Sequence, residues 1–296
     1  MQGRVVVTGV TGMIGSRLAR WLAEEGCEVH GLARFSRARP SEDEVRSWGV
    51  RPWRRDLTTD RLDDLPDADY VFHEACQWDA PKGESEDPGE VAGWNATMAL
   101  RVMYRWRRAK AVVLASTGGV LGQSGEPATE EAPPAPDAKG YHLGKFAMEE
   151  VALGSSIEFG TPTAILRYFW PVDFDERAAS YVRSVREGKP VPGTGAEHPY
   201  RWTPIDLPDV CTYTVRSVEV ASSPPAVLLC GGPEVVSRRR LVEIAAEELG
   251  REPVFDERAA GWQEFLADSS RLYELLGEPA RRLTDVVRSA ARAARS

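Results

Sequence analysis

The sequence predicts an α/β fold built on a parallel sheet, followed by a mostly helical C-terminal part. Two observations carry this prediction. Short apolar runs with strand character alternate with helical patterns as far as Cys230, and the residues after it are mainly helical in pattern. The first run, Val5–Val7, leads into a glycine-rich turn and a helix. Together with the next run it forms a βαβ unit, whose strands are parallel.

The glycine-rich turn spans Thr8–Gly15 and is the first candidate binding site. Glycine lets the backbone turn tightly and approach a phosphate, and the helix that follows offers free N–H groups and its positive dipole end. The spacing G-x-x-G-x-x-G is a weak signal by itself. Its place directly after an apolar strand favours a dinucleotide site over a merely structural turn. The candidate residues are Gly9, Thr11, Gly12, Met13, Ile14 and Gly15.

The second strand, Cys27–Arg34, is expected to end near the adenosine ribose of the dinucleotide. A carboxylate at this point would bind the ribose hydroxyls of NAD, but the position holds Ala33. Arg34, Ser36 and Arg37 follow it. Because guanidinium can bind a 2′-phosphate bidentately, we predict NADP as the cofactor, with NAD possible. The alternative is that Arg34 and Arg37 are ordinary solvated charges.

The third and fourth strands place further candidates. A short polar helix over 41–48 precedes the third strand, which ends at Asp56 and Leu57. Asp56 either accepts from the adenine amino group or caps the following turn. The fourth strand, Tyr70–Ala75, leads into a long loop over 76–93 that contains Trp78. Ligands bind beyond the carboxyl ends of parallel strands, so Ala75 is a cofactor candidate and Trp78 a substrate candidate.

The later elements carry a pair of polar side chains with helical spacing. A helix over 94–108 precedes the fifth strand, Ala111–Ala115, which ends at Ser116 and Thr117. A helix then begins near Tyr141 and places Tyr141 and Lys145 on one face. The remaining predicted elements are strands over 163–169 and 226–230 and helices over 209–218, 238–249, 268–276 and 283–296.

Composition excludes several classes of function. The net charge is −8, from 37 basic and 45 acidic residues, which gives no support to nucleic-acid binding. No apolar run approaches the roughly 20 residues of a membrane span, and the early first strand leaves no room for a signal peptide. The four cysteines form no C-x-x-C pair and the four histidines show no ligand spacing. We therefore expect reduced thiols, no metal site and a cytoplasmic protein.

The ordered motifs resemble the extended short-chain dehydrogenase/reductases, the NAD-dependent epimerase/dehydratase group. The resemblance covers nearly the whole chain. It implies a Rossmann-type, doubly wound parallel sheet from 1–169 plus about 202–232, and a smaller, mostly helical substrate lobe from about 170–201 plus 233–296. The motifs are T-G-x-x-G-x-x-G at Thr8–Gly15, S-T-x-x-V-x-G at Ser116–Gly122, Tyr141 with Lys145, Asn95, Leu166–Phe169, Gly231–Glu234 and Leu276–Gly277.

The resemblance implies hydride transfer between C4 of a nicotinamide and a carbon that bears a hydroxyl or keto group. Tyr141 is the implied general acid/base. A phenol with a pKa near 10 is a poor base at neutral pH, so we expect the Lys145 ammonium to lower the pKa of Tyr141 and to hold the nicotinamide ribose. Thr117 is expected to donate to the substrate oxygen, with Ser116 as the fallback.

Departures from the family pattern concern the substrate. Gly118 and Gly119 stand where dehydratases of the family place acidic residues, so dehydratase chemistry is not expected. Trp170 stands where sugar-nucleotide epimerases carry Asn. We expect a more apolar pocket lined by Trp78, Trp170 and Trp202, unless these indoles belong to the core. Arg201 lies near the position of the family's phosphate-binding arginine.

The leading hypothesis is an NAD(P)-dependent oxidoreductase or epimerase that acts on a sugar or nucleotide-sugar-like substrate. One alternative is an NADPH-dependent carbonyl reductase of a non-sugar metabolite. A non-catalytic NADP-binding sensor is a third hypothesis, which the complete set of Thr117, Tyr141 and Lys145 disfavours. The resemblance also implies a homodimer packed through the helices at 94–108 and 141–153. The apolar residues of these helices could instead belong to the core.

Overall fold

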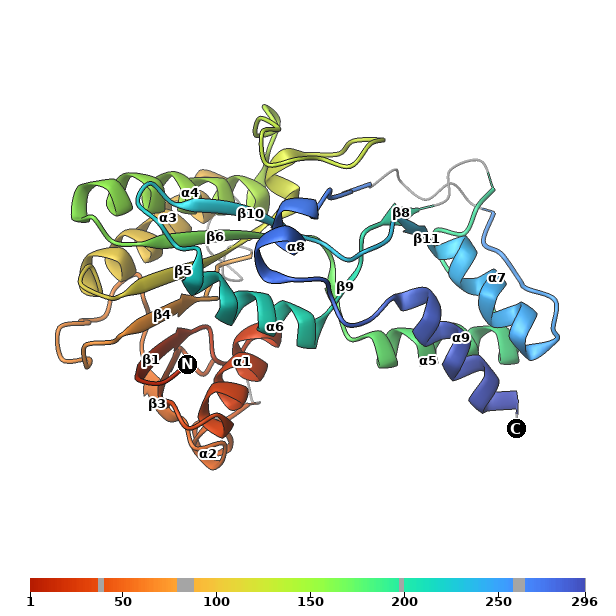
Figure 1. Cartoon of the computed structure of the whole chain (residues 1–296), viewed down its shortest axis with the longest axis horizontal. Helices are drawn as coiled ribbons and strands as arrows, with labels where there is room; N and C mark the ends of the chain where they lie inside the picture. The colour runs from red at the N-terminus through yellow and green to blue at the C-terminus, as the bar shows by residue number, and fades with distance from the viewer. Residues whose placement is uncertain (37–39, 79–87, 197–199, 258–263, 296) are drawn as a thin grey trace. The chain divides into compact units, whose positions relative to one another are not determined.

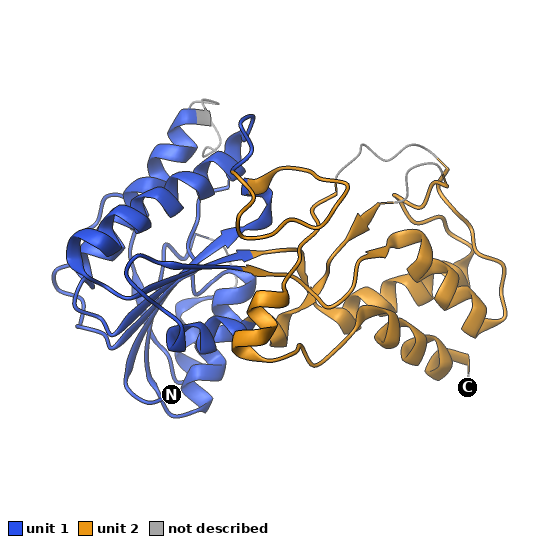
Figure 2. Ribbon diagram, turned by 45° about the horizontal axis from the view of Figure 1, so that its top comes forward, with its two compact units in different colours: residues 1–120, 134–167, 211–228 blue, residues 121–133, 168–210, 229–296 orange. Residues whose placement is uncertain are grey.

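A computed structural model describes the chain except for residues 37–39, 79–87, 197–199, 258–263 and 296 (Figure 1). The described chain forms two compact units, each with its own core (Figure 2). Unit 1 comprises Met1–Val120, Pro134–Arg167 and Cys211–Leu228. Unit 2 comprises Leu121–Pro133, Tyr168–Val210 and Leu229–Ser296.

Unit 1 is built on a seven-stranded sheet with the order β10-β6-β5-β4-β1-β2-β3, which confirms the predicted fold class. The pairs β1–β2, β1–β4, β2–β3 and β4–β5 are parallel. The order reverses between β1 and β4, and ligands of doubly wound sheets bind at this kind of switch point. The strands are β1 (Arg4–Thr8), β2 (Glu28–Ala33), β3 (Arg51–Arg54), β4 (Tyr70–His73), β5 (Ala111–Thr117), β6 (Thr163–Tyr168) and β10 (Ala226–Cys230).

Helices cover both faces of this sheet. On one face Val6 and Val71 pack against Met98 of α3 and against Trp106, which directly follows this helix. The alternate residues of β1 are also fully buried, as expected for a parallel sheet between two helical layers (Figure 2). The elements on this unit are α1 (Met13–Glu24), α2 (Glu42–Ser47), α3 (Pro88–Arg105), η1 (Gly118–Leu121), α4 (Gly140–Phe159), most of α6 (Leu207–Arg216) and η2 (Ser217–Glu219).

Helix α3 begins earlier than the sequence predicted. It starts at Pro88 rather than Trp94, so the predicted loop over 76–93 is too long at its C-terminal end. Proline suits the first helical turn because that turn needs no N–H donor, and Glu90 complements the dipole there. The helix ends at Arg105, before the predicted Arg108.

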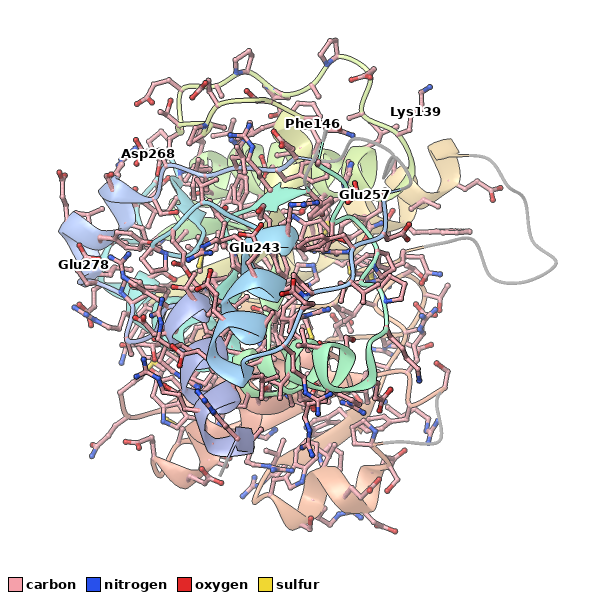
Figure 3. All side chains as sticks on the ribbon, turned by 90° about the vertical axis from the view of Figure 1, so that its right-hand side faces the viewer. Lys139, Phe146, Glu243, Glu257, Asp268 and Glu278 are labelled. Atoms are coloured by element: carbon pink, nitrogen blue, oxygen red, sulfur yellow. The ribbon has the colours of Figure 1, made fainter. Side chains whose placement is uncertain are left out.

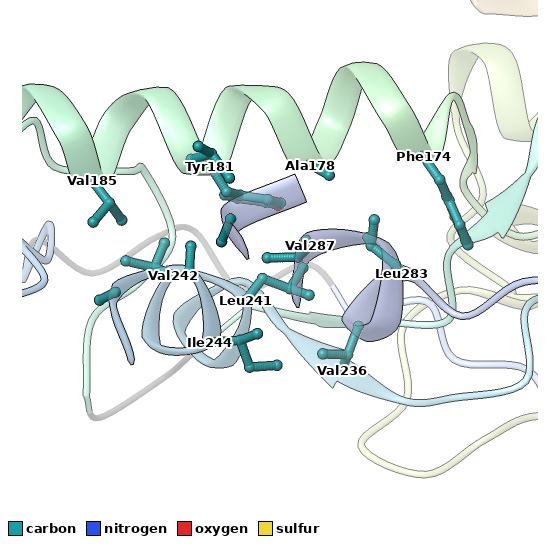
Figure 4. Packing of buried hydrophobic residues seen from close by; sticks show 14 of the residues in the cluster. Phe174, Ala178, Tyr181, Val185, Val236, Leu241, Val242, Ile244, Leu283 and Val287 are labelled. Carbon is teal, nitrogen blue, oxygen red and sulfur yellow. The ribbon is translucent and has the colours of Figure 1, made fainter. Parts of the chain in front are cut away.

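Unit 2 is mostly helical, and its core lies between three helices (Figure 4). Phe174 and Tyr181 of α5 pack with Leu241 of α7 and Val287 of α9. On its polar face α7 carries Glu243 (Figure 3), which forms ion pairs with the arginines one turn earlier. The elements are β7 (Pro171–Val172), α5 (Phe174–Glu187), β8 (Arg201–Trp202), β9 (Ile205–Asp206), β11 (Val236–Ser237), α7 (Arg238–Leu249), α8 (Ser270–Leu276) and α9 (Leu283–Arg295).

Sequence signals explain where the unit 2 helices begin and end. Asp173 accepts from the Glu176 N–H at the start of α5, and Ser237 does the same for the Arg240 N–H of α7. Gly188 ends α5 in the left-handed conformation, which glycine adopts without steric cost. None of the helices in the described ranges combines the length and apolar character needed to cross a membrane.

Candidate active site

The glycine-rich turn forms because two of its residues have no side chain. Gly9 has a φ of +70°, and a Cβ there would lie 2.7 Å from the backbone nitrogen of Ala75. A Cβ on Gly15 would overlap the carbonyl of Gly9. The turn between β1 and α1 therefore packs directly on the chain that leaves β4. The N–H groups of Gly9 and Val10 donate to the carbonyl of Leu32 on β2, which fixes the turn at the ends of three neighbouring strands.

A cavity of about 530 Å³ lies beside this turn and contains most of the predicted cofactor residues. Its volume is typical of a ligand pocket. The cavity wall includes Gly9, Thr11, Gly12, Arg34, Ser36, Asp56, Leu57, Ala75 and Trp78. Met13, Ile14 and Gly15 form the start of α1 instead, and Arg37 lies outside the described residues. The glycine cradle and the polar wall fit a dinucleotide.

Arg34 lies at the β2 end of the cavity and is exposed. Its guanidinium forms no ion pair with any carboxylate in the part of the chain that the structure describes. By contrast, Arg54 pairs with Glu42 at 2.6 Å and Arg55 with Asp64 at 2.6 Å. The Arg34 guanidinium is therefore available to an anionic ligand.

Asp56 both lines the cavity and closes a turn. It accepts from the Thr58 N–H at 2.8 Å and from the Thr58 hydroxyl at 2.6 Å. Burial raises the pKa of Asp56, but these hydrogen bonds and the charge of Arg34 outweigh it and hold the pKa below its ordinary value. Asp56 therefore caps the turn, and its place in the cavity wall also allows it to accept from an adenine amino group.

Tyr141 and Lys145 lie on one face at the start of α4, as the spacing predicted. The Lys145 ammonium is buried and donates to the carbonyl of Ala115 at 2.6 Å. It lies 5.9 Å from the centre of the Tyr141 ring. Lys145 thus joins α4, which carries Tyr141, to the end of β5, which carries Thr117.

The expected lowering of the Tyr141 pKa does not occur. Burial raises the pKa of the phenol, and the Cys76 thiol and Glu74 carboxylate raise it further. The ammonium of Lys145 is already bound to a backbone carbonyl, and it does not outweigh these effects. The phenol is therefore protonated at neutral pH and is poised to donate a proton.

The structure distinguishes Thr117 from its fallback Ser116. Ser116 is buried, and its hydroxyl donates to the carboxylate of Glu149. Glu149 also pairs with Arg167 through bonds of 3.0 and 2.8 Å. Thr117 is only half-buried, and its oxygen accepts from the Gly119 N–H at 3.2 Å. Its own proton has no acceptor among the described residues, so Thr117 is the better donor to a ligand.

Several residues of this region were not found from the sequence. His142 packs against Gly119, where a Cβ would collide with the imidazole. Glu149 follows Lys145 by one helical turn, so its place on the same face could have been found from the spacing. Cys76 and Gln77 also line the cavity, but no signal in the sequence marks them.

Trp170 and Arg201 belong to unit 2. Trp170 has a φ of +52°, and its ring lies 5.8 Å from that of Tyr200 and 5.9 Å from that of Trp202. Trp202 is fully buried, so it belongs to the core. Arg201 donates to both carboxylate oxygens of Glu264 at 2.8 and 2.7 Å, so its charge is already paired.

One family model matches about two thirds of the chain. Residues 5–199 match the model of the NAD dependent epimerase/dehydratase family. None of the curated proteins compared with the sequence matches it significantly.

Solved structures share the fold. The UDP-glucuronic acid 4-epimerase of Bacillus cereus, in complex with UDP-glucuronic acid and NAD, is 22% identical over 97% of this chain and 98% of that chain, with a TM-score of 0.76. The Thermotoga maritima UDP-glucose 4-epimerase with UDP-glucose is 21% identical over 99% and 98%, with a TM-score of 0.75. The Thermus thermophilus UDP-glucose 4-epimerase complex with NAD is 23% identical over 97% of each chain, with a TM-score of 0.73.

Proposed function

The chain belongs to the NAD dependent epimerase/dehydratase family, and from this premise we propose that it transfers a hydride at a hydroxyl or keto carbon of a sugar or nucleotide-sugar-like substrate. It is an NAD(P)-dependent enzyme of the extended short-chain dehydrogenase/reductase type. In our proposal unit 1 binds the cofactor and unit 2 forms the substrate lobe. The observation that carries the proposal is the shared placement of Tyr141 and Lys145 on α4, against the strand end that bears Thr117.

The residues have separate roles in this reaction. The nicotinamide cofactor supplies the site that accepts and returns the hydride. Tyr141 moves the proton to or from the substrate oxygen, and its protonated phenol suits donation to a carbonyl. Thr117 donates a second hydrogen bond to the same oxygen and orients it. Lys145 holds α4 against β5 through Ala115 and supplies positive charge beside the phenol.

The substrate class is supported by the names of the structural relatives, several of which hold UDP-sugars. We would incubate the purified protein with UDP-glucose and UDP-glucuronic acid and resolve the products by nuclear magnetic resonance. An epimerase forms the C4 epimer without net change in the nicotinamide absorbance. Net consumption of NADPH with a non-sugar ketone, and no epimer, would instead support a carbonyl reductase.

We propose NADP as the preferred cofactor. Arg34 supports this because it is exposed in the cavity without an ion pair to a described carboxylate, and a 2′-phosphate would pair with it. Six of the similar structures contain NAD, so both cofactors must be compared. Titration should show tighter binding of NADP, and Arg34→Glu should reverse the preference. Equal or tighter binding of NAD by the wild-type protein would contradict the proposal.

We further propose a cytoplasmic homodimer formed through α3 and α4. Leu100 and Tyr104 are exposed one turn apart on α3, and Leu153 and Ile157 are exposed one turn apart on α4. The rings of Tyr104 and Phe159 lie 6.0 Å apart, which places the two helices side by side. A two-fold axis would cover this apolar face with its own copy. The free state of all four cysteines supports the cytoplasm as the location.

A further inference from the structure

The indole of Trp78 lies face to face on the phenol ring of Tyr141. Their ring centres are 4.0 Å apart and their planes are parallel within 1°. Trp78 is nevertheless 60% exposed, so one indole face covers Tyr141 while the rest of the side chain is accessible. A contact of this kind fixes the plane of the phenol and excludes water from one of its faces.

The backbone next to Trp78 is held by a buried side chain. The Gln77 N–H donates to Asn95 Oδ1 at 2.9 Å, and Asn95 Nδ2 donates back to the Gln77 carbonyl at 2.9 Å. Asn95 is fully buried in α3 and also donates to the Val91 carbonyl at 2.7 Å. A Cβ on Gly144 would lie 2.7 Å from the same amide, so α4 packs directly on it. The backbone that leads into Trp78 is therefore held on α3, and α4 packs on the amide that holds it.

Trp78 also lines the cofactor cavity, whereas Tyr141 does not. The cavity extends from Arg34 at the end of β2 to Trp78 beyond the end of β4. Since the adenosine belongs at the β2 end, the nicotinamide belongs at the other end. The exposed part of the indole thus faces the space where a planar ring must be placed.

We propose that Trp78 is a positioning residue, which holds the phenol of Tyr141 in its reactive orientation and bounds the nicotinamide end of the cavity. The inference rests on the proposed function, because it takes Tyr141 as the acid/base. The role of Trp78 concerns the geometry of the site and does not depend on which sugar is bound. Its consequence is that removing the indole exposes the phenol and enlarges the nicotinamide end of the cavity.

The test compares Trp78→Phe, Trp78→Leu and Trp78→Ala with Trp48→Ala. Trp48 is a matched control because it lies at the end of α2 in the same unit, where Arg20 covers its ring at 4.7 Å. It is outside the cavity wall. Because Trp78 is largely exposed, we expect all four variants to fold, which circular dichroism checks.

The first readout is the accessibility of Tyr141, measured as its rate of acetylation by N-acetylimidazole at neutral pH, with the modified residue assigned by peptide mass spectrometry. Removing the indole exposes the phenol, so Trp78→Ala and Trp78→Leu should raise the rate of Tyr141 acetylation by about fivefold or more. Trp78→Phe keeps a stacked ring and should restore most of the original protection. An unchanged rate of Tyr141 acetylation in Trp78→Ala would overturn the proposal, whether or not any substrate is turned over.

The second readout is kinetic. Trp78→Ala should lower kcat by about tenfold, as expected for loss of one aromatic contact that orients the acid, and raise the KM for the substrate by less than about threefold. Trp78→Phe should recover most of kcat, and Trp48→Ala should behave as wild type. A normal kcat in Trp78→Ala would also overturn the proposal. If no nucleotide sugar is turned over, the proposed function fails while the acetylation rate of Tyr141 still decides the role of Trp78.

Discussion

A buried ion pair supports the strand end that carries Thr117. Glu149 and Arg167 form two hydrogen bonds, and Glu149 also accepts from Ser116. Replacing Glu149 by Gln keeps the shape but leaves the buried guanidinium without its counter-charge. We expect Glu149→Gln to lower the free energy of unfolding by about 3–5 kcal/mol. Urea denaturation measures this, and Glu150→Gln on the exposed face of the same helix is the control. Equal midpoints for the two variants would contradict the account.

A second prediction for a single residue concerns the pH dependence of stability, because His73 is buried as the neutral imidazole. A hydrogen bond of 2.7 Å joins Thr8 Oγ1 and His73 Nδ1, and Thr8 Oγ1 also accepts from the Ala75 N–H. Burial, and then the charge of Lys145, lower the pKa of His73 from 6.5 to about 3. The unfolded chain therefore binds the proton first as the pH falls. This contribution to stability is complete above pH 6.5 and is lost progressively as the pH falls toward 3.

The expected loss from His73 is about 2 kcal/mol of unfolding free energy between pH 6.5 and pH 5. His30 and His142 also have lowered pKa values, which adds to the slope with the same sign. Denaturation at both pH values, for the wild type and for His73→Asn, separates the contribution of His73. The variant should be less stable at pH 7 but should lose less on acidification. A slope that the substitution leaves unchanged would show that His73 does not cause it.

The spacing of Tyr141 and Lys145 was sufficient to predict that they share a helix face, because the helical period fixes that relation. The pKa of Tyr141 could not be predicted in the same way. It depends on burial and on Cys76 and Glu74, which lie in the segment that follows β4. Local geometry was readable in the sequence, but the electrostatics of the assembled site was not.

At the scale of elements, the turn between β1 and α1 depends on its first glycine. Gly9→Ala would strain a φ of +70° and would press a methyl group on the backbone of Ala75. Gly26 is a matched control because its φ is +85° and an added methyl carbon would meet nothing within 4 Å. We expect Gly26→Ala to cost about 1–2 kcal/mol and to bind cofactor normally. Gly9→Ala should cost more and lose cofactor binding by titration. Normal cofactor affinity in Gly9→Ala would contradict the assigned role of the turn.

The central strands β1 and β5 could be predicted because each contains a continuous apolar run, as buried parallel strands require. The two-residue strands β7, β8, β9 and β11 have no such signal. For example, β8 pairs with β11 through Trp202 and Val236, which are far apart in the sequence. Pairings of this length arise only when the fold brings the segments together.

At the scale of the whole molecule, the paired apolar faces of α3 and α4 predict a dimer. Leu100 is 50% exposed and Ile157 is 57% exposed, so a charge at either position should not disturb the core. The double variant Leu100→Glu/Ile157→Glu should be a folded monomer by light scattering. Leu275→Glu changes an exposed leucine of α8 in unit 2 and should leave the dimer intact. A monomeric wild-type protein at micromolar concentration would contradict the proposal.

The sequence predicted the family and the cofactor class of the molecule, but not its substrate. Arg201 illustrates the reason. Its position suggested a phosphate ligand, yet it is paired with Glu264, which lies 63 residues further along the chain. Trp170 likewise packs on the rings of Tyr200 and Trp202. Whether a polar or aromatic side chain meets substrate depends on such distant partners, which no local pattern reveals.

The central claim is that Tyr141 carries the proton of a hydride-transfer reaction. The most direct measurement is the rate of C4 epimer formation from a nucleotide sugar at saturating cofactor, for the wild type and for Tyr141→Phe. The account predicts that the variant binds cofactor normally but is slower by about 100-fold or more, as expected for loss of a general acid/base. A Tyr141→Phe variant that turns over substrate at the wild-type rate would contradict it.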